Sequence, residues 1–345
     1  MGKSPARRLP PRWLKNSFPC CRRRLPLPAS CLRELQGPSG QELARLTHPG
    51  GVTALAFTPD GNRLVSGCID GAVRIWHLPT GKEILRVEKK EERENHVGAL
   101  ALSPDGRLLA ACYGLGQVRL WTLADGRETV TLELTEGQFS SKLCVGFSAD
   151  SRWLAVGDHW GSLVWEVATG KQVARLSHDD WVETLAFSPT KPWLVTGSED
   201  RTARVWELPA GREVVRVTHG GPVTRVAFSP DGRFVVSSEA CPGPYRGGMS
   251  PCRALVRVWE AATGVEVAQF PHEKGINDVA FSPDGRLLAS ASRDGTARLW
   301  RLQPEDLIRQ ACNRLPWNLM QTEWRRYFGD LPYRPTCPNL PVPKD

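Results

Sequence analysis

Long apolar runs are missing from this 345-residue chain. No stretch of 18 or more apolar residues occurs, so we expect no membrane-spanning helix and no membrane partner. The first residues lack the apolar core of a secretory signal, and the opening MGKSPA has alanine where a myristoylation signal requires serine or threonine. The ten cysteines show no CxxC spacing, so no clustered zinc site is expected. Cysteines inside strand-like runs instead predict a reducing, cytoplasmic location.

Acidic residues are absent from residues 1–30, which contain eight Lys and Arg residues and six prolines. These eight positive charges account for the whole formal net charge of +8, so residues 31–345 balance to zero. Any electrostatic attraction to nucleic acid or to an acidic surface therefore belongs to residues 1–30. The prolines exclude a continuous amphipathic helix, so we predict a basic, disordered leader over residues 1–30.

Motifs of enzymes and of cofactor sites are also missing. The chain contains no HExxH, GxSxG or EF-hand loop. Its Gly-Lys pairs at 81–82 and 170–171 are followed by Glu and Gln, so neither is a phosphate-binding loop. The sequence therefore predicts no enzymatic activity, no cofactor and no metal site.

What the sequence does contain is one phrase that is repeated six times. Versions of FSPDG begin at residues 57, 102, 147, 187, 228 and 281. A tryptophan follows each of them, at Trp76, Trp121, Trp165, Trp206, Trp259 and Trp300. Successive tryptophans are 41 to 53 residues apart, and each interval holds four short alternating segments separated by turn residues. That period predicts the four-stranded blades of a β-propeller.

The phrases SPDGRLLAS and DGTARLW resemble the WD-repeat propeller family over roughly residues 40–302. The resemblance implies an all-β propeller, which we place at residues 31–302, with blades numbered 1 to 6 by their tryptophans. The strand count predicts six blades, with GQELARL at 40–46 as the outer strand that closes the last blade. Seven blades are the alternative, because CLREL at 31–35 resembles a blade remnant.

Residues 303–345 do not belong to the repeat. PEDLIRQACNRL has a proline and acids at its start and one apolar face, which predicts a short C-terminal helical extension before a proline-rich end. The segment EWRRYFGDLPYRPTCPNLP resembles the tails of bacterial WD-repeat proteins of the NTPase-linked signalling type.

The family resemblance also implies a hydrogen-bonded set of His, Ser or Thr, Asp and Trp inside each complete blade. Three blades fit, with His48, Ser66, Asp70 and Trp76; His178, Thr196, Asp200 and Trp206; and His272, Ser290, Asp294 and Trp300. Ser, His and Asp suggest a hydrolase triad, but an active site normally occurs once, so we interpret the sets as structural. Blade 2 has Leu115 and blade 5 has Arg253 at the Asp position, and blade 3 lacks the His and is one residue short.

Propellers of this family mostly bind proteins or peptides on the face that carries the connections into strand one and between strands two and three. We call it the top face. The insertion 239–254 and the charged run 88–95 fall there. The candidate partner-binding residues are Trp181, Glu183, Glu199, Thr224, Arg225, Tyr245, Arg246, Asn277, Asp278 and Arg293.

The leading hypothesis is a non-enzymatic, cytoplasmic scaffold that binds a protein or peptide on the top face, as a monomeric propeller within a complex. One alternative is a sensor or regulatory module of a bacterial NTPase-linked signalling system, or a piece of a longer chain. The other is contact with nucleic acid or an acidic surface through residues 1–30, which predicts affinity that falls with salt.

Overall fold

The computed structural model describes residues 35–36, 41–42, 44–88, 96–114, 116–134, 144–240 and 254–302, with Met320 and Pro341 as single residues. Over these residues the chain is all β, with 25 strands and no helix. The all-β expectation is therefore confirmed for the part of the chain that is described.

Six antiparallel sheets follow one another along the chain, and within each of them every strand pairs with its neighbours in sequence. Blades 1 and 2 consist of β3 (Val52–Phe57), β4 (Arg63–Cys68), β5 (Val73–His77) and β6 (Lys82–Val87), and of β7 (Val97–Leu102), β8 (Leu108–Tyr113), β9 (Gln117–Thr122) and β10 (Glu128–Glu133). Blades 3 and 4 consist of β11 (Cys144–Phe147), β12 (Trp153–Asp158), β13 (Gly161–Glu166) and β14 (Lys171–Ser177), and of β15 (Val182–Phe187), β16 (Trp193–Ser198), β17 (Thr202–Glu207) and β18 (Arg212–Thr218).

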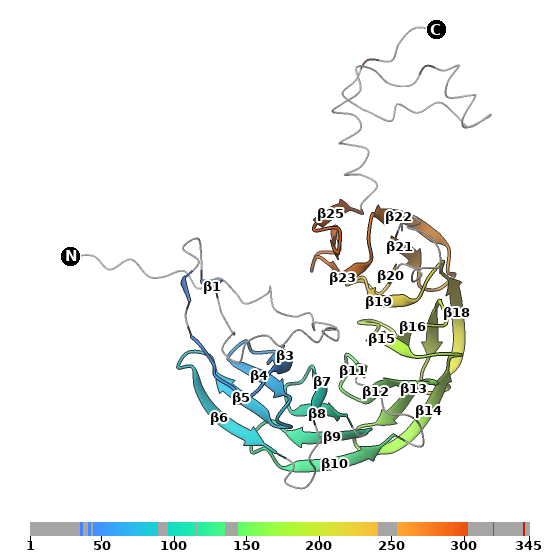
Figure 1. Cartoon of the computed structure of the whole chain (residues 1–345). Helices are drawn as coiled ribbons and strands as arrows, with labels where there is room; N and C mark the ends of the chain where they lie inside the picture. The colour runs from blue at the N-terminus through green and yellow to red at the C-terminus, as the bar shows by residue number, and fades with distance from the viewer. Residues whose placement is uncertain are drawn as a thin grey trace, which may run out of the picture.

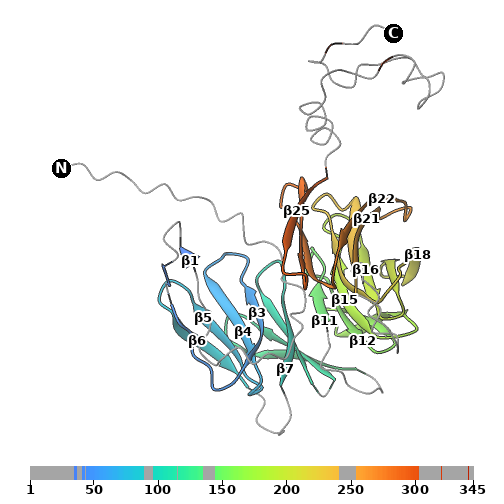
Figure 2. The same cartoon turned by 45° about the horizontal axis from the view of Figure 1, so that its top comes forward.

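Blade 5 consists of β19 (Val223–Phe228), β20 (Phe234–Glu239), β21 (Ala254–Glu260) and β22 (Glu266–His272), and blade 6 of β23 (Ile276–Phe281), β24 (Leu287–Ser292) and β25 (Ala297–Arg301). A separate ribbon pairs β1 (Leu35–Gln36) with β2 (Gln41–Glu42). Figures 1 and 2 show the blades in chain order around an arc, with the first strand of each blade on the inner side. Blades 1 and 6 form the two ends of this arc.

The repeated Ser-Pro-Asp-Gly phrase forms the turn between the first and second strands. In blade 5, Ser229 Oγ donates to Asp231 Oδ1 at 2.5 Å, and the same oxygen accepts the Arg233 N–H at 3.0 Å. Gly232 has a φ of 71°, in the left-handed region that glycine adopts without strain. The same hydroxyl-to-carboxylate bond recurs at Thr58–Asp60, Ser103–Asp105, Ser148–Asp150 and Ser282–Asp284.

Adjacent blades bury their apolar faces against each other. The residue before each blade tryptophan is at most 2% exposed in blades 1 to 5, at Ile75, Leu120, Val164, Val205 and Val258. Glycines in the second strands allow this close approach. A Cβ on Gly197 would lie 2.6 Å from Val223 of the next blade. The same relation holds for Gly67 with Val97 and for Gly157 with Val182, so three interfaces depend on a glycine facing a branched residue.

The two ends of the arc lack this cover among the described residues. On blade 6, Leu299 is 72% exposed, although it occupies the position that is buried in the other five blades. On blade 1, Leu55 is 36% exposed, whereas Val226 and Val279 at the same place in β19 and β23 are 2% and 4% exposed. We call these two facing ends the seam.

The strand expected at 40–46 does not pair with blade 6 in this structure. Residues 41–42 form β2 and pair with β1, and β25 is an edge strand within the described part of blade 6. Ala44 and Leu46 nevertheless pack against Leu64 and Trp76 of blade 1. The closing role of residues 40–46, and with it the blade count, stays a prediction.

Other predictions lie on residues that the structure does not describe. These are the basic leader 1–30, the C-terminal helical extension in 303–345, most of the insertion 239–254 with Tyr245, Arg246 and Arg253, the run 89–95, and Leu115.

Candidate functional site

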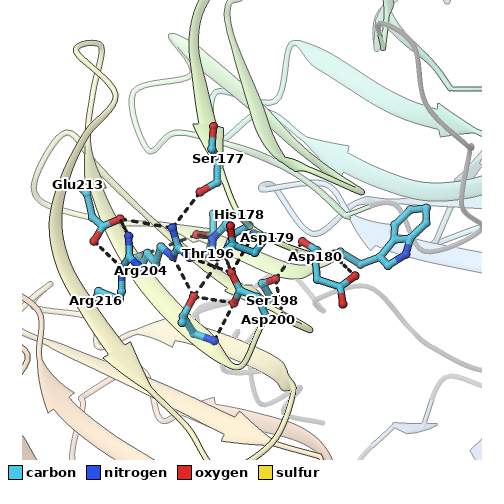
Figure 3. A network of polar contacts seen from close by, with 12 residues as sticks. Ser177, His178, Asp179, Asp180, Thr196, Ser198, Asp200, Arg204, Glu213 and Arg216 are labelled. Atoms are coloured by element: carbon cyan, nitrogen blue, oxygen red, sulfur yellow. Dashed lines mark hydrogen bonds and ion pairs between the residues drawn. The ribbon is translucent and has the colours of Figure 1, made fainter.

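The polar set of blade 4 is complete, and Figure 3 shows three of its members, His178, Thr196 and Asp200. Trp206 Nε1 donates to Thr196 Oγ1 at 2.8 Å. Thr196 Oγ1 in turn lies 2.7 Å from His178 Nε2, and His178 Nδ1 lies 2.8 Å from Asp200 Oδ2. The side chains of His178 and Asp200 are 0% and 5% exposed. The structure thus joins the four residues that the resemblance implied for this blade.

The chemistry of donors and acceptors gives this chain of bonds a direction. An indole N–H can only donate, so the Thr196 oxygen accepts from Trp206 and its own proton is directed to His178 Nε2. The other possible acceptor, the Arg204 carbonyl, is farther away at 3.5 Å. His178 then carries its proton on Nδ1 and donates to Asp200. The Thr196 hydroxyl is therefore occupied by two hydrogen bonds, one accepted from Trp206 and one donated to His178, and is not a free nucleophile.

Asp200 is held by several donors at once. Thr202 donates to Oδ1 from both its N–H and its hydroxyl, at 2.8 and 2.6 Å, and Arg204 Nη2 donates to Oδ2 at 2.9 Å. Burial by itself would raise the pKa of Asp200, but the hydrogen bonds from His178 and Thr202 outweigh it and hold that pKa below its usual range. Asp200 is therefore a buried, charged carboxylate that stabilises the turn through its hydrogen bonds.

Blade 6 repeats this arrangement. Trp300 Nε1 donates to Ser290 Oγ at 2.8 Å, His272 Nε2 lies 2.7 Å from Ser290 Oγ, and His272 Nδ1 lies 3.0 Å from Asp294 Oδ2. Thr296 binds Asp294 Oδ1 through its N–H and hydroxyl, as Thr202 binds Asp200. The four residues implied for blade 6 are thus also brought together.

Blade 1 differs from the expected pattern at its aspartate. His48 and Trp76 both bond to Ser66, at 2.7 and 2.8 Å. Asp70 does not join them, because it forms a two-pronged pair with Arg74, at 3.3 and 2.6 Å. The residue two positions after Asp70 is Ala72, which offers only its N–H. In blades 4 and 6 a threonine hydroxyl at this position also binds Oδ1 of the aspartate. Blade 1 lacks this hydroxyl, and the Asp70 carboxylate pairs with Arg74 and not with His48.

Blade 5 contains a three-residue version that the sequence interpretation did not identify. His219 Nε2 lies 2.7 Å from Ser237 Oγ, and Trp259 Nε1 donates to the same oxygen at 2.9 Å. The signal was available, because His219 precedes Ser237 by 18 residues, the spacing found in the other three blades. Burial, together with the charge of Arg257, lowers the pKa of His219 to about 4.

Blades 2 and 3 replace the hydroxyl residue by an apolar one. The strand registers place Ala111 and Val156 where Ser66 lies in blade 1, and both are fully buried. In blade 2, the edge of Tyr113 packs on Trp121, with ring centroids 6.1 Å apart. These blades are therefore held by apolar packing at the place where the others carry polar bonds.

The candidate partner residues of blades 5 and 6 mostly contact each other. Arg225 Nε lies 3.4 Å from Asp278 Oδ1 across the two blades, and Arg225 is only 6% exposed. Arg293 Nε donates to Asn277 Oδ1 at 3.3 Å. Thr224 Oγ1 donates to the Ser238 carbonyl at 3.4 Å. These contacts hold the top-face turns together.

Of the candidates in blade 4, only two are accessible on the top face. Glu183 is 2% exposed and is thus a buried carboxylate. Trp181 and Glu199 are half-buried, and the Glu199 N–H donates to the Trp181 carbonyl at 2.8 Å. Trp181 is the accessible aromatic candidate of blade 4, and Asn277 and Arg293 of blade 6 are exposed as well.

Trp181 belongs to a group of three stacked rings that the sequence interpretation missed. His159 lies between Trp160 and Trp181, with ring centroids 4.2 Å apart on each side and interplanar angles of 24° and 15°. We call these three residues the ring stack. Trp160 is 49% exposed. The stack therefore presents an aromatic surface to solvent between blades 3 and 4.

The one-residue deletion in blade 3 creates this surface. Asp158 pairs with Gly161, so the turn between β12 and β13 contains only His159 and Trp160. Asp158 Oδ1 accepts the Trp160 N–H at 2.9 Å, and the Trp160 carbonyl accepts the His178 N–H at 3.0 Å. A tight turn thus holds two rings at its tip, where blades 4 and 6 have the aspartate turn.

No helix in the described ranges is long and apolar enough to cross a membrane. No group of three or more His, Cys, Asp or Glu residues there is arranged to hold a metal ion.

A family model for the WD domain, G-beta repeat, matches residues 40–77, 88–122, 170–207, 212–241 and 264–301, which together are more than half of the chain. The chain therefore belongs to the WD-repeat family, whose members are generally non-enzymatic and mediate protein interactions. The first three strands of blade 3 lie between the second and third matched segments, in keeping with its shortened turn and apolar replacements.

Two solved structures share the fold. The computationally designed Ika8 protein is 26% identical, with a TM-score of 0.63 over 76% of this chain and 75% of that chain. A chain of the mitotic checkpoint complex is 20% identical, with a TM-score of 0.63 over 78% of this chain and 80% of that chain. These likenesses confirm the propeller architecture.

Curated relatives match only short segments. Ribosome biogenesis protein ERB1 of Ajellomyces capsulatus is 36% identical over 72 residues, which are 21% of this chain and 8% of that protein. ERB1 of Candida glabrata is 40% identical over 48 residues, which are 14% of this chain and 6% of that protein. The chain thus matches less than a tenth of the length of these relatives. Both are fungal, so they do not support the bacterial type expected from the tail.

Proposed function

We propose that this protein is a non-enzymatic scaffold that binds a protein or peptide on the top face of its propeller. The observation that carries the proposal is the ring stack, because Trp160 exposes 49% of its surface next to Trp181 on that face. Exposed, rigid aromatic side chains are typical anchors of protein interfaces.

The buried polar sets support a structural role for the residues that resemble a triad. Ser66 and Thr196 are fully buried and Ser290 is 2% exposed, and each hydroxyl is shared between a histidine and a tryptophan. A catalytic serine needs access to substrate and donors for the developing oxyanion. These three positions offer no such access, which favours binding over hydrolysis.

Site-specific cross-linking tests the proposal. A photoreactive phenylalanine analogue is placed at Trp160 on the top face, and at Arg107, in the turn between β7 and β8 on the opposite face, as an exposed control. After illumination in cells, we expect defined protein adducts from position 160 and none in common with position 107. Adducts from position 107 alone, or the same adducts from both positions, would overturn the top-face assignment.

The other hypotheses gain less support. The fungal relatives give no backing to a bacterial signalling role, and the names of those relatives describe those proteins. Nucleic-acid contact through residues 1–30 concerns residues outside the described ranges. A cytoplasmic location remains part of the proposal, supported by the burial of Cys68, Cys112 and Cys144 inside the strands.

We further propose that the propeller has six blades and that residues 40–46 supply the fourth strand of blade 6. Ala44 and Leu46 would contact a Cβ placed on Gly81, at 3.4 and 4.0 Å. Ala174 and Leu176, in the outer strand of blade 3, stand in the same relation to Gly211 of blade 4, at 3.3 and 3.4 Å. Residues 44–46 therefore lie against blade 1 where the outer strand of a preceding blade belongs.

A recurring ion pair supports this closure. In four blades, the arginine two residues before the tryptophan pairs with a glutamate on the outer strand, and the register places that glutamate opposite the tryptophan. The pairs are Arg74–Glu83 (3.6 Å), Arg119–Glu128 (3.0 Å), Arg204–Glu213 (3.6 Å) and Arg257–Glu266 (3.7 Å). Blade 3 has neither partner, because Leu163 and Gln172 occupy the two positions.

Blade 6 has the arginine of this pair but no outer strand among the described residues. Arg298 is 34% exposed, whereas Arg74 and Arg204 are 1% and 6% exposed. Aligning GQELARL with GKQVARL of blade 3 places Glu42 opposite Trp300 and Ala44 opposite Leu299. Glu42 is thus the partner that Arg298 needs, and this strand also covers the exposed edge of β25.

A charge exchange tests the closure. Arg298→Glu and Glu42→Arg should each lower the free energy of unfolding by about 1 kcal/mol, and the double variant should recover most of it. As a covalent check, an Ala44→Cys, Leu299→Cys pair should form a disulfide that peptide mapping detects, and an Ala44→Cys, Ala297→Cys pair should form much less. Equal cross-linking of both pairs, with no recovery in the exchanged variant, would contradict the register.

A further inference from the structure

The ring stack carries an inference about the chemistry of the partner. Its three rings are nearly parallel, and the outer ring, Trp160, has 49% of its surface exposed. Backbone bonds from Trp160 to Asp158 and His178 fix the turn that bears it. A flat indole face is therefore held in place before any ligand arrives, so little ordering entropy is lost when a planar group stacks on it.

Carboxylates lie beside the ring stack, at its His159 and Trp181 members. Asp180 Oδ1 lies 4.0 Å from His159 Nε2 and accepts the Trp181 N–H at 2.8 Å, and the Asp180 side chain is 45% exposed. Its other carboxylate oxygen has no hydrogen-bond partner among the described residues. Asp179, on the same turn, is 88% exposed, and Figure 3 shows Asp180 on the side of the blade 4 network away from Glu213.

The nearest buried cation does not cancel these charges. Arg204 is 6% exposed and binds Asp200 at 2.9 Å, and its contacts to Asp179 and Glu213 are longer, at 3.5 and 3.6 Å. Arg204 thus shares its charge among Asp200, Asp179 and Glu213, while Asp180 makes no contact with it in the described structure. The solvent-accessible part of the site therefore combines an aromatic face with net negative charge.

We propose that the ring stack and Asp180 bind the guanidinium group of an arginine in a partner peptide. The proposal rests on the peptide-binding function above and specifies its ligand. A guanidinium group is planar, stacks on indole faces and donates paired N–H bonds to carboxylates. Lysine offers a point charge without a plane, so it matches the carboxylate but not the stacked face.

The test uses three capped peptides that are identical except at the central residue, which is arginine, lysine or citrulline. Citrulline keeps the planar shape of arginine and removes its charge. The full chain is labelled with 5-fluorotryptophan, and the fluorine signals of positions 160 and 181 are assigned with Trp160→Phe and Trp181→Phe variants. Trp193, whose ring contacts Lys191 in blade 4 at 4.0 Å from the ring centroid, serves as the internal control signal.

We expect the arginine peptide to shift the signals of Trp160 and Trp181 but not that of Trp193, and to bind about tenfold more tightly than the citrulline peptide. Trp160→Ala should remove the binding, and Asp180→Asn, whose amide oxygen still accepts the Trp181 N–H, should weaken it about fivefold. Arg107→Ala on the opposite face should leave it unchanged.

Equal binding of the arginine and citrulline peptides, or of the arginine and lysine peptides, would overturn the guanidinium assignment. So would the absence of any shift at Trp160. If position 160 still cross-links a partner in cells in that case, the scaffold function stands and only the ligand chemistry is wrong. If neither experiment gives a signal at position 160, both proposals fail.

Discussion

The contrast between blades 4 and 1 predicts a difference in energetic coupling between histidine and aspartate. In blade 4, His178 Nδ1 and Asp200 Oδ2 are 2.8 Å apart and both side chains are almost fully buried. In blade 1, Asp70 bonds to Arg74 and not to His48. A double-mutant cycle measures this coupling separately from the cost of each single substitution.

The magnitude follows from the kind of bond. A hydrogen bond to a charged group contributes about 1.5–3 kcal/mol, and the lack of solvent around His178 and Asp200 places this one in that range. Replacing His178 and Asp200 by alanine, singly and together, should thus give a coupling of about 2 kcal/mol. The same cycle on His48 and Asp70 should give less than about 0.5 kcal/mol, because no bond joins them.

Urea unfolding followed by tryptophan fluorescence supplies the free energies for both cycles. His272 and Asp294 in blade 6 provide a matched positive control, since their distance is 3.0 Å and their side chains are 0% and 5% exposed. Equal coupling in blades 1 and 4 would refute the argument that the residue after the turn, Ala72 or Thr202, decides which partner the aspartate takes.

Three further predictions concern single residues. Because the pKa of His219 falls from 6.5 to about 4 on folding, the unfolded chain binds its proton first. Stability should therefore fall between pH 6.5 and 4, by about 3 kcal/mol at most, and urea unfolding of the His219→Gln variant should show a smaller fall. Gly161→Ala should lower the free energy of unfolding by more than about 2 kcal/mol, because its Cβ would lie 2.0 Å from the Leu176 carbonyl oxygen at a φ of 144°. Gly61→Ala, with a φ of 71° and nothing within 4 Å, should cost only about 1 kcal/mol in the same assay. Tyr113→Phe should raise the thermal midpoint, because the buried Tyr113 hydroxyl has no hydrogen-bond partner among the described residues and its removal should stabilise by about 1 kcal/mol. A lowered midpoint for Tyr113→Phe would show that the hydroxyl is satisfied.

The repeat made most of the fold predictable because its signals are local. The Ser-Pro-Asp-Gly turn is built from bonds within five residues, as at Ser229 and Asp231, so the sequence places it without knowledge of the rest of the chain. The tryptophan period then places the third strand of each blade. The hydrogen bond between the histidine and the hydroxyl residue is also predictable from their spacing of 18 residues. The His219–Ser237 pair has the same spacing and was overlooked.

The burial of individual top-face side chains was less predictable, because it depends on irregular backbone at the ends of the strands. The register of β15 and β16 shifts between Val182 and Thr184, so Glu183 lies in a bulge. A bulge breaks the simple alternation of strand faces, so alternation does not predict which side chain is buried there: Glu183 is 2% exposed, whereas Asn277 is exposed. Thr224 and Asn277 lie at the same kind of shift in blades 5 and 6.

The ring stack was unpredictable for a different reason. Trp160 and Trp181 belong to different blades, and only the packing of one blade on the next brings His159 between them. The deletion in blade 3 was visible in the sequence. Its consequence, a turn of two aromatic residues facing the neighbouring blade, required the three-dimensional arrangement.

The pairing of every blade strand with its sequence neighbours has a consequence for how the chain folds. Hairpin contacts close short loops, so each blade can assemble without waiting for distant parts of the chain. The proposed closure at the seam is different, because it pairs residue 44 with residue 299, which are separated by nearly the whole propeller sequence. During synthesis, the N-terminal strand emerges first and its partner emerges last among the blades. We therefore expect the seam to be the last contact to form and the first to open.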